Sequence, residues 1–221
     1  TFVEHMFRCL DCRACETVCP SGVRFGHMME STRARIVEEQ STNWISRFTL
    51  NHIFPYPGRF HLVARLLQFY SQSGLSGFLR STGLLERLAP DYAAAEQMMP
   101  EVEPGSGVTP GIVYSARGRP SGRVAFFSGC VMNSVLGRLN RESVELLTAA
   151  GYDVVVPDGQ VCCGALANHA GLQDTARRMA LSNIPAFPVD DVEAIIVNAS
   201  GCGAMLAEYP LLVEGAEAFS D

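Results

Sequence analysis

The chain has 221 residues, of which 48% are hydrophobic and 18% charged, and its formal net charge is −6. This composition is sufficient for a buried core and excludes an intrinsically disordered chain. No apolar run reaches the roughly 18 residues of a membrane span, and no basic-then-apolar leader is present, so neither a span nor secretion is predicted. The first 90 residues carry a slight excess of arginine, which is too dispersed to predict a nucleic-acid surface.

Apolar residues recur at helical spacing in the first half of the chain. A Pro-rich break at 55–58 separates the second of these stretches from the third. The pattern predicts helices over residues 22–39, 44–53 and 59–70, with two shorter helical segments over 75–79 and 84–88.

The second half alternates between short strand-like runs and helical patterns, which is typical of βαβ units and a small parallel sheet. The runs rich in β-branched and aromatic residues predict strands over 123–127, 153–156 and 194–197. Helical spacing predicts helices over 134–150 and 172–183. Between the two halves, residues 101–122 are rich in Gly and Pro and predict a linker.

Eight cysteines form two groups of four. The compact group is Cys9, Cys12, Cys15 and Cys19. The dispersed group is Cys130, Cys162, Cys163 and Cys202. Cysteines that follow one another at intervals of three residues are poorly placed to form disulfides together, so the sequence favours metal binding in a reducing compartment.

The compact group has the spacing C-x2-C-x2-C-x3-C and is followed by Pro20, which is the bacterial ferredoxin run. A zinc site would more often show two separated C-x2-C pairs or additional histidines. In two-cluster ferredoxins the fourth cysteine binds the other [4Fe–4S] cluster. Because no second copy of the run occurs here, either the chain is a fragment that lacks an upstream half, or all four cysteines hold one cluster. The absence of an initiator Met favours the fragment.

The dispersed cysteines each follow a predicted strand. In an open α/β sheet the loops after the strand ends gather at one edge, so we expect these four sulfurs to converge. Cys162 and Cys163 are adjacent and precede Gly164, whose lack of a side chain permits a close approach. The residues alone leave four alternatives: a second iron–sulfur cluster, a zinc site, a redox dithiol, or buried apolar cysteines.

The dispersed pattern resembles the cysteine-rich CCG domain of heterodisulfide-reductase-type subunits. That domain continues with a C-x2-C pair, of which this chain keeps Cys202 but has Ala199 at the first position. The runs 5–25, 162–165 and 198–204, with Glu208-Tyr209, are similar to the glycolate oxidase iron–sulfur subunit. The resemblance implies an upstream ferredoxin half and a downstream second CCG repeat, both outside this chain.

The resulting fold class is α+β: a helical ferredoxin-like [4Fe–4S] domain (second half only) followed by a small α/β CCG domain with a parallel sheet. The expected boundaries are 1–99 for the first domain, 100–122 for the linker and 123–221 for the first CCG repeat. All eight cysteines are candidate ligands, and no residue is a candidate catalytic group. The resemblance implies one or two [4Fe–4S] clusters in the full-length ferredoxin domain, with a further cluster or zinc in the CCG domain.

The resemblance further implies an oxidoreductase subunit that relays electrons. Separate FAD-bearing subunits would oxidise glycolate to glyoxylate, and a quinone or another acceptor would receive the electrons. It implies a cytoplasmic location and allows peripheral association with the cytoplasmic face of the inner membrane. The alternatives are a subunit serving a lactate or glycerol-3-phosphate dehydrogenase and a heterodisulfide-reductase-like subunit. Arg13 and Arg24 flank the compact motif, where their charge would raise a cluster's potential unless they are ordinary solvated arginines.

Overall fold

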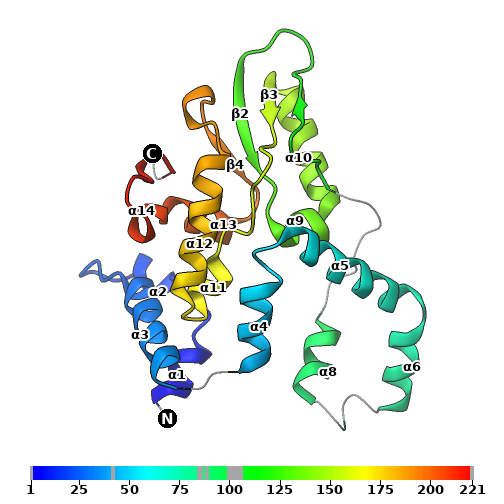
Figure 1. Cartoon of the computed structure of the whole chain (residues 1–221), viewed down its shortest axis with the longest axis vertical. Helices are drawn as coiled ribbons and strands as arrows, with labels where there is room; N and C mark the ends of the chain where they lie inside the picture. Colours follow the sequence, from blue (N-terminus) through cyan, green and yellow to red (C-terminus); the bar gives the residue numbers. More distant parts are fainter. Residues whose placement is uncertain (1, 41–42, 84–86, 88–89, 99–106, 220–221) are drawn as a thin grey trace. The chain divides into compact units, whose positions relative to one another are not determined.

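The computed structural model describes residues 2–40, 43–83, 87, 90–98 and 107–219 (Figure 1). Two compact units share the chain. Unit 1 comprises residues 1–56, 159–190 and 199–221, and unit 2 comprises residues 57–158 and 191–198. The polypeptide therefore passes repeatedly from one unit to the other, and unit 1 combines segments from both halves of the sequence.

Unit 1 is helical. Its α-helices are α1 (Phe2–Arg8), α2 (Ala14–Thr17), α3 (Phe25–Glu39), α4 (Trp44–His52), α11 (Ala165–His169), α12 (Gln173–Asn183), α13 (Ser200–Ala207) and α14 (Tyr209–Leu212). Three short 3-10 helices are also described in the C-terminal half of the chain: η1 (Ile184–Ala186), η2 (Val189–Asp191) and η3 (Glu217–Phe219).

Helix α3 is the centre of the first half of unit 1 and packs against α1, α2 and α11. Its buried face repeats at helical spacing through Met29, Arg33, Ile36 and Val37, which explains why the sequence pattern predicted it. The predictions over 22–39, 44–53 and 172–183 are confirmed as α3, α4 and α12, with ends that differ by at most a few residues.

Unit 2 contains the sheet and the remaining helices. Its described elements are α5 (Pro57–Gln72), α6 (Leu75–Thr82), α8 (Pro90–Gln97), β1 (Val113–Tyr114), β2 (Gly122–Phe127), α9 (Cys130–Ser134), α10 (Gly137–Ala149), β3 (Tyr152–Val155) and β4 (Ile195–Val197). Helix α5 begins at Pro57, where a proline is well tolerated because the first helical N–H has no partner within the helix. The short segment predicted over 84–88 lies almost entirely outside the described residues.

The sheet has the strand order β1-β3-β2-β4. Strand β2 lies between β3 and β4 and is parallel to both, with Val124 opposite Val154 and Phe126 opposite Ile196. Its residues 124–127 are all buried, as expected for a central strand covered on both faces. Helix α10 packs against β3 beside this core (Figure 1).

The parallel sheet predicted from the sequence needs one correction. The three predicted strands are present and parallel, but β1 pairs antiparallel with β3, so the sheet is mixed. Strand β1 has only two residues and lies inside the segment predicted as a linker, where it left no periodic signal. Within that segment residues 107–122 belong to unit 2, and Val108 is part of its buried core. The domain boundaries drawn from the sequence stay a prediction.

None of the described helices combines the length and the apolar character needed to cross a bilayer. All eight cysteines are free thiols.

Candidate functional site

The compact cysteine motif forms the loop between α1 and α3, with the single turn of α2 inside it. Cys9 and Cys19 are half-buried, whereas Cys12 and Cys15 are exposed. Asp11 and Arg13, on either side of Cys12, both adopt left-handed backbone conformations with φ of 53° and 56°. Such residues are uncommon outside glycine, and they turn successive peptide groups toward one side of a loop.

Backbone N–H groups of this loop are directed at cysteine sulfurs. The N–H of Asp11 lies 3.4 Å from Cys9 Sγ. At the other end of the motif, hydrogen bonds from the backbone of Val23 and then Ser21 lower the pKa of Cys19. Donors placed in this way stabilise thiolates, which are the form of cysteine that binds metal. These backbone donors and the four cysteines are therefore compatible with a cysteine-bound iron–sulfur cluster. Hydrogen bonds to the ligand sulfurs also tune the reduction potential of such a cluster.

Buried and half-buried ionic groups connect this loop to the C-terminal part of unit 1. The Arg13 guanidinium donates to both carboxylate oxygens of Glu208, the residue that follows α13, with Nη2 at 2.9 Å from Oε2. The hydrogen bonding to Glu208 raises the pKa of Arg13. His169 of α11 places Nδ1 at 3.0 Å from Asp11 Oδ2 and at 3.1 Å from Glu30 Oε1. Residues that are 139 to 195 positions apart in the sequence are thus paired at the edge of the cysteine loop.

The two buried carboxylates of this network respond differently to their surroundings. Burial raises the pKa of Asp11, whose carboxylate oxygens have no hydrogen-bond partner among the described residues beyond the close approach of His169. Burial also acts to raise the pKa of Glu30, but the hydrogen bond and charge of His169 and the charge of Arg13 outweigh it and lower that pKa. The surroundings of Glu30 therefore favour its ionised form, whereas the burial of Asp11 disfavours the ionised form there.

Cys162 and Cys163 lie in the loop that joins β3 to α11, and both are buried. Gly164 follows with φ of +93°, and a Cβ at this position would lie 3.2 Å from Cα of Ala176 in α12. The positive φ and the tight contact with α12 both favour glycine at this position, whereas the approach of both thiolates to one metal, for which the sequence suggested Gly164, stays a prediction.

The sulfurs of Cys163 and Cys202 lie 3.4 Å apart, although 39 residues separate them in sequence. The Cys163 thiol donates toward Cys202, and hydrogen bonding with Cys162 and Cys202 together with burial raises the pKa of Cys163 well above its usual range. The same contact lowers the pKa of Cys202. Two thiolates on one tetrahedral zinc ion are about 3.8 Å apart, so the separation of these two sulfurs is close to that expected for a shared zinc ion.

A hydrogen-bond network that the sequence did not reveal holds the double-cysteine loop. The Asn183 side chain, at the end of α12, donates to the carbonyl of Cys162 at 3.1 Å and to Tyr209 Oη at 2.8 Å, and it accepts from the N–H of Val161. Tyr209 Oη in turn donates to the carbonyl of Cys163 at 3.0 Å. Burial, the largest influence, raises the pKa of Tyr209, so the hydroxyl remains a donor. The one available signal was an Asn on the apolar face of a predicted helix.

Cys130 begins α9 in unit 2, directly after Gly129. Asn140 of α10 donates to the carbonyl of Ser128 at 2.7 Å and accepts from Asn198 at 2.8 Å, which joins the loops that follow β2 and β4. The expected convergence is found for Cys162, Cys163 and Cys202 in unit 1, whereas the approach of Cys130 to them stays a prediction.

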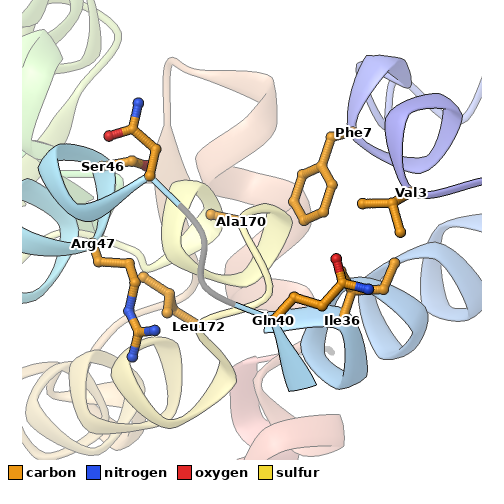
Figure 2. A pocket seen from close by; sticks show the side chains of 9 residues that line it. Val3, Phe7, Ile36, Gln40, Ser46, Arg47, Ala170 and Leu172 are labelled. Carbon is orange, nitrogen blue, oxygen red and sulfur yellow. The ribbon is translucent and has the colours of Figure 1, made fainter. Parts of the chain in front are cut away.

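A cavity of about 350 Å³ lies in unit 1 beside α1 (Figure 2). Its apolar wall includes Phe7, Ile36 and Leu172, and Gln40 and Arg47 supply polar groups. Figure 2 shows the Phe7 ring directed into this space from α1, two residues before Cys9. A cavity of this size is at the lower end of the range for small-molecule sites.

Among the matched family models, one includes the dispersed cysteines, whereas the compact motif lies outside both. The family model described as "Glycolate oxidase iron-sulfur subunit, linker region" matches residues 41–99, and the model "Cysteine-rich domain" matches residues 124–207. The chain is 39% identical to the probable glycolate oxidase iron–sulfur subunit of Bacillus subtilis over 212 residues, which are 93% of this chain and 48% of that protein.

Two further relatives are less similar to this chain. The glycolate oxidase iron–sulfur subunit of Escherichia coli is 28% identical over 228 residues, covering 99% of this chain and 49% of that protein. Lactate utilization protein A of an Exiguobacterium species is 31% identical over 91 residues, covering 41% of this chain and 37% of that protein. No solved structure matches the chain.

The matched cysteine-rich domain and the similarity to a glycolate oxidase iron–sulfur subunit place this chain in an iron–sulfur protein family. More specifically, the chain is a homologue of the glycolate oxidase iron–sulfur subunit and carries that family's linker region. It spans about half the length of the curated relatives it matches.

Proposed function

We propose that the chain is the part of a glycolate dehydrogenase iron–sulfur subunit that conducts electrons between flavin subunits and a quinone or another acceptor. Oxidation of glycolate to glyoxylate releases two electrons and two protons to FAD on the partner subunits. Reduction of a quinone to a quinol consumes two electrons and two protons. Iron–sulfur clusters bound here would transfer those electrons one at a time.

The observation that carries this proposal is the structure of the two cysteine sites within one homologue of that subunit. Backbone N–H groups face Cys9 and Cys19 at the first site, and three buried or half-buried sulfurs gather at the second.

We assign the ligands as the sequence suggested them. Cys9, Cys12 and Cys15 hold one [4Fe–4S] cluster, and Cys19 belongs to the cluster of an upstream motif. Cys130, Cys162, Cys163 and Cys202 hold a second group, either a cluster or zinc. The proposed location is the cytoplasm, in peripheral association with the inner membrane.

The test is iron, sulfide and zinc analysis of the anaerobically purified full-length protein, combined with EPR. We expect Cys12→Ser to abolish the signal of the first site, and Cys163→Ser to remove metal from the second. The protein should be inert toward glycolate until its flavin subunits are added. A full-length protein without iron, or one that oxidises glycolate alone, would contradict the proposal.

The second candidate is a subunit that serves a lactate dehydrogenase, and the similarity to lactate utilization protein A favours it. Co-purified flavin subunits decide between the two, because only the assembled complex should discriminate glycolate from lactate. Cleavage of a heterodisulfide by the reduced protein alone would instead identify a disulfide reductase, against which Ala199 weighs because it removes one ligand of the CCG pattern.

A further inference from the structure

Arg33 lies behind the first cysteine loop, on the buried face of α3, and is only 3% exposed. Its guanidinium donates to three backbone carbonyls. The Nε and Nη2 atoms bond Met6 at 3.0 and 2.6 Å, Nη2 also bonds the carbonyl of Cys9, and Nη1 bonds His169 at 2.7 Å. It also lies over the Phe7 ring, 5.5 Å from the centroid. These contacts place a fixed positive charge against the backbone of a candidate cluster ligand.

The charge of Arg33 differs from that of Arg13, which lies within the cysteine motif. Arg13 pairs with Glu208 through two hydrogen bonds and also approaches Glu30, so its charge is largely neutralised. No carboxylate among the described residues lies within salt-bridge distance of Arg33, whose bonded partners are neutral carbonyls. A buried cation without a direct counter-ion retains a strong field at short range.

The surrounding charges do not cancel this field at the loop. Asp11 belongs to the loop itself, and its carboxylate lies 3.0 Å from His169 Nδ1, whereas no ion pair joins it to Arg33, whose charge is the weakest of the influences on the pKa of Asp11. Glu30 is held by His169 and Arg13, and His27 lies 4.0 Å from it. Arg13, His27 and His169 are thus the basic groups that face these carboxylates at close range, whereas the guanidinium of Arg33 donates to backbone carbonyls.

Close packing keeps Arg33 in position. Gly171, in the turn after α11, has φ of +80°, and a Cβ at this position would lie 2.6 Å from the carbonyl oxygen of Arg33. The carbonyl of Cys9 points to the guanidinium, so in a trans peptide the N–H of Leu10 points to the opposite side. Arg33 thereby fixes the orientation of the peptide that follows the first cysteine.

We infer that Arg33 is the positioning residue that sets the reduction potential of the first cysteine site. The sequence offered this effect for Arg13 and Arg24, beside the alternative that they are ordinary solvated arginines. The inference rests on the proposed function, since it requires a redox group on Cys9, Cys12 and Cys15. Adding one electron makes that site more negative, and a buried cation favours the more negative state. Removing the charge therefore lowers the potential.

The experiment is a mediated redox titration of the anaerobic full-length protein with dithionite, followed by EPR, with iron content measured in parallel. At the midpoint potential of the wild-type first site, we expect Arg33→Met to lower the ratio of reduced to oxidised first site at least tenfold. For a one-electron couple this ratio corresponds to a midpoint potential about 59 mV lower. Arg33→Lys keeps the charge and should change the ratio by less than threefold. The control is Arg35→Met, an exposed arginine two residues further along α3, which should leave the ratio within twofold.

A ratio within twofold of wild type in an iron-replete Arg33→Met protein overturns the inference. If that variant binds no iron, Arg33→Lys decides: a potential like wild type supports the charge effect, and a tenfold shift refutes it. A wild-type protein without a first-site EPR signal would instead refute the proposed function, before any variant is compared.

Discussion

Replacing Tyr209 by Phe tests whether the buried hydrogen-bond network holds the double-cysteine loop. The phenyl ring fills the same space, and only the hydroxyl is lost. That hydroxyl donates to the carbonyl of Cys163 and accepts from Asn183, and both Tyr209 and Asn183 are completely buried. The substitution therefore leaves one carbonyl and one N–H without a partner.

Each buried group left without a hydrogen bond costs about 1–3 kcal/mol, so we expect Tyr209→Phe to destabilise the protein by about 2–4 kcal/mol. For a chain of this size that corresponds to a melting temperature about 5–12 °C lower. Thermal unfolding of the anaerobic protein, followed by circular dichroism, measures the change. Tyr92→Phe is the matched control, because Tyr92 is half exposed and its hydroxyl has no hydrogen bond among the described residues.

A double-mutant cycle with Asn183→Ala sharpens the result. If the two side chains act as one unit, the combined loss will be smaller than the sum of the single losses by about 1 kcal/mol or more. Alkylation of Cys163 by iodoacetamide should also accelerate in Tyr209→Phe, since the loop opens more often. A melting temperature within 2 °C of wild type, together with unchanged alkylation, would refute the role assigned to this network.

Three further predictions concern unit 1. Gly171→Ala should cost about 3 kcal/mol or more in urea unfolding, because its Cβ meets a backbone oxygen at 2.6 Å, whereas Gly215→Ala, with a similar φ of +82° and open space, should cost only about 1 kcal/mol. The pKa of Glu30 is lowered from 4.5 on folding, so its ionised form stabilises the protein above pH 4.5, and this contribution is lost as the pH falls through the folded-state pKa. Glu30→Gln should therefore flatten the pH dependence of the urea midpoint between about pH 3 and 6. Glu208→Gln should lower the free energy of unfolding by about 1–3 kcal/mol, because it leaves Arg13 without its carboxylate partner. Adding Arg13→Gln to the same chain should recover part of this loss. Strictly additive losses from the two substitutions would disprove the pairing.

The spacing of apolar residues along the sequence predicted the helices and strands whose side chains alternate between a buried and an exposed face or form one apolar run. Helix α3 followed from the spacing of its apolar residues, and β2 followed from an unbroken apolar run at 124–127. The contact between Cys163 and Cys202 followed from a rule about strand ends, although Cys202 lies within the first turn of α13.

The remaining features depend on pairings across long separations in the sequence. Arg33 looked like one of several charges on an amphipathic helix, since its carbonyl acceptors in α11 and the cysteine loop leave no local signal. Arg13 was correctly located beside the first cluster loop, but Glu208 is 195 residues away and neutralises it. Strand β1 has two residues and depends on β3 for its existence.

The interleaved course of the chain also has a consequence for biogenesis. The first cysteine loop is synthesised before the groups that enclose its base, because His169 and Glu208 come much later in the chain. A ribosome-bound intermediate that ends before α11 has the cysteines of the loop but leaves Arg33 without one of its carbonyl partners. Under the proposed function, cluster insertion into the first site should therefore be most stable once α11 and Glu208 have been synthesised, and truncation before α11 should impair iron retention at the first site.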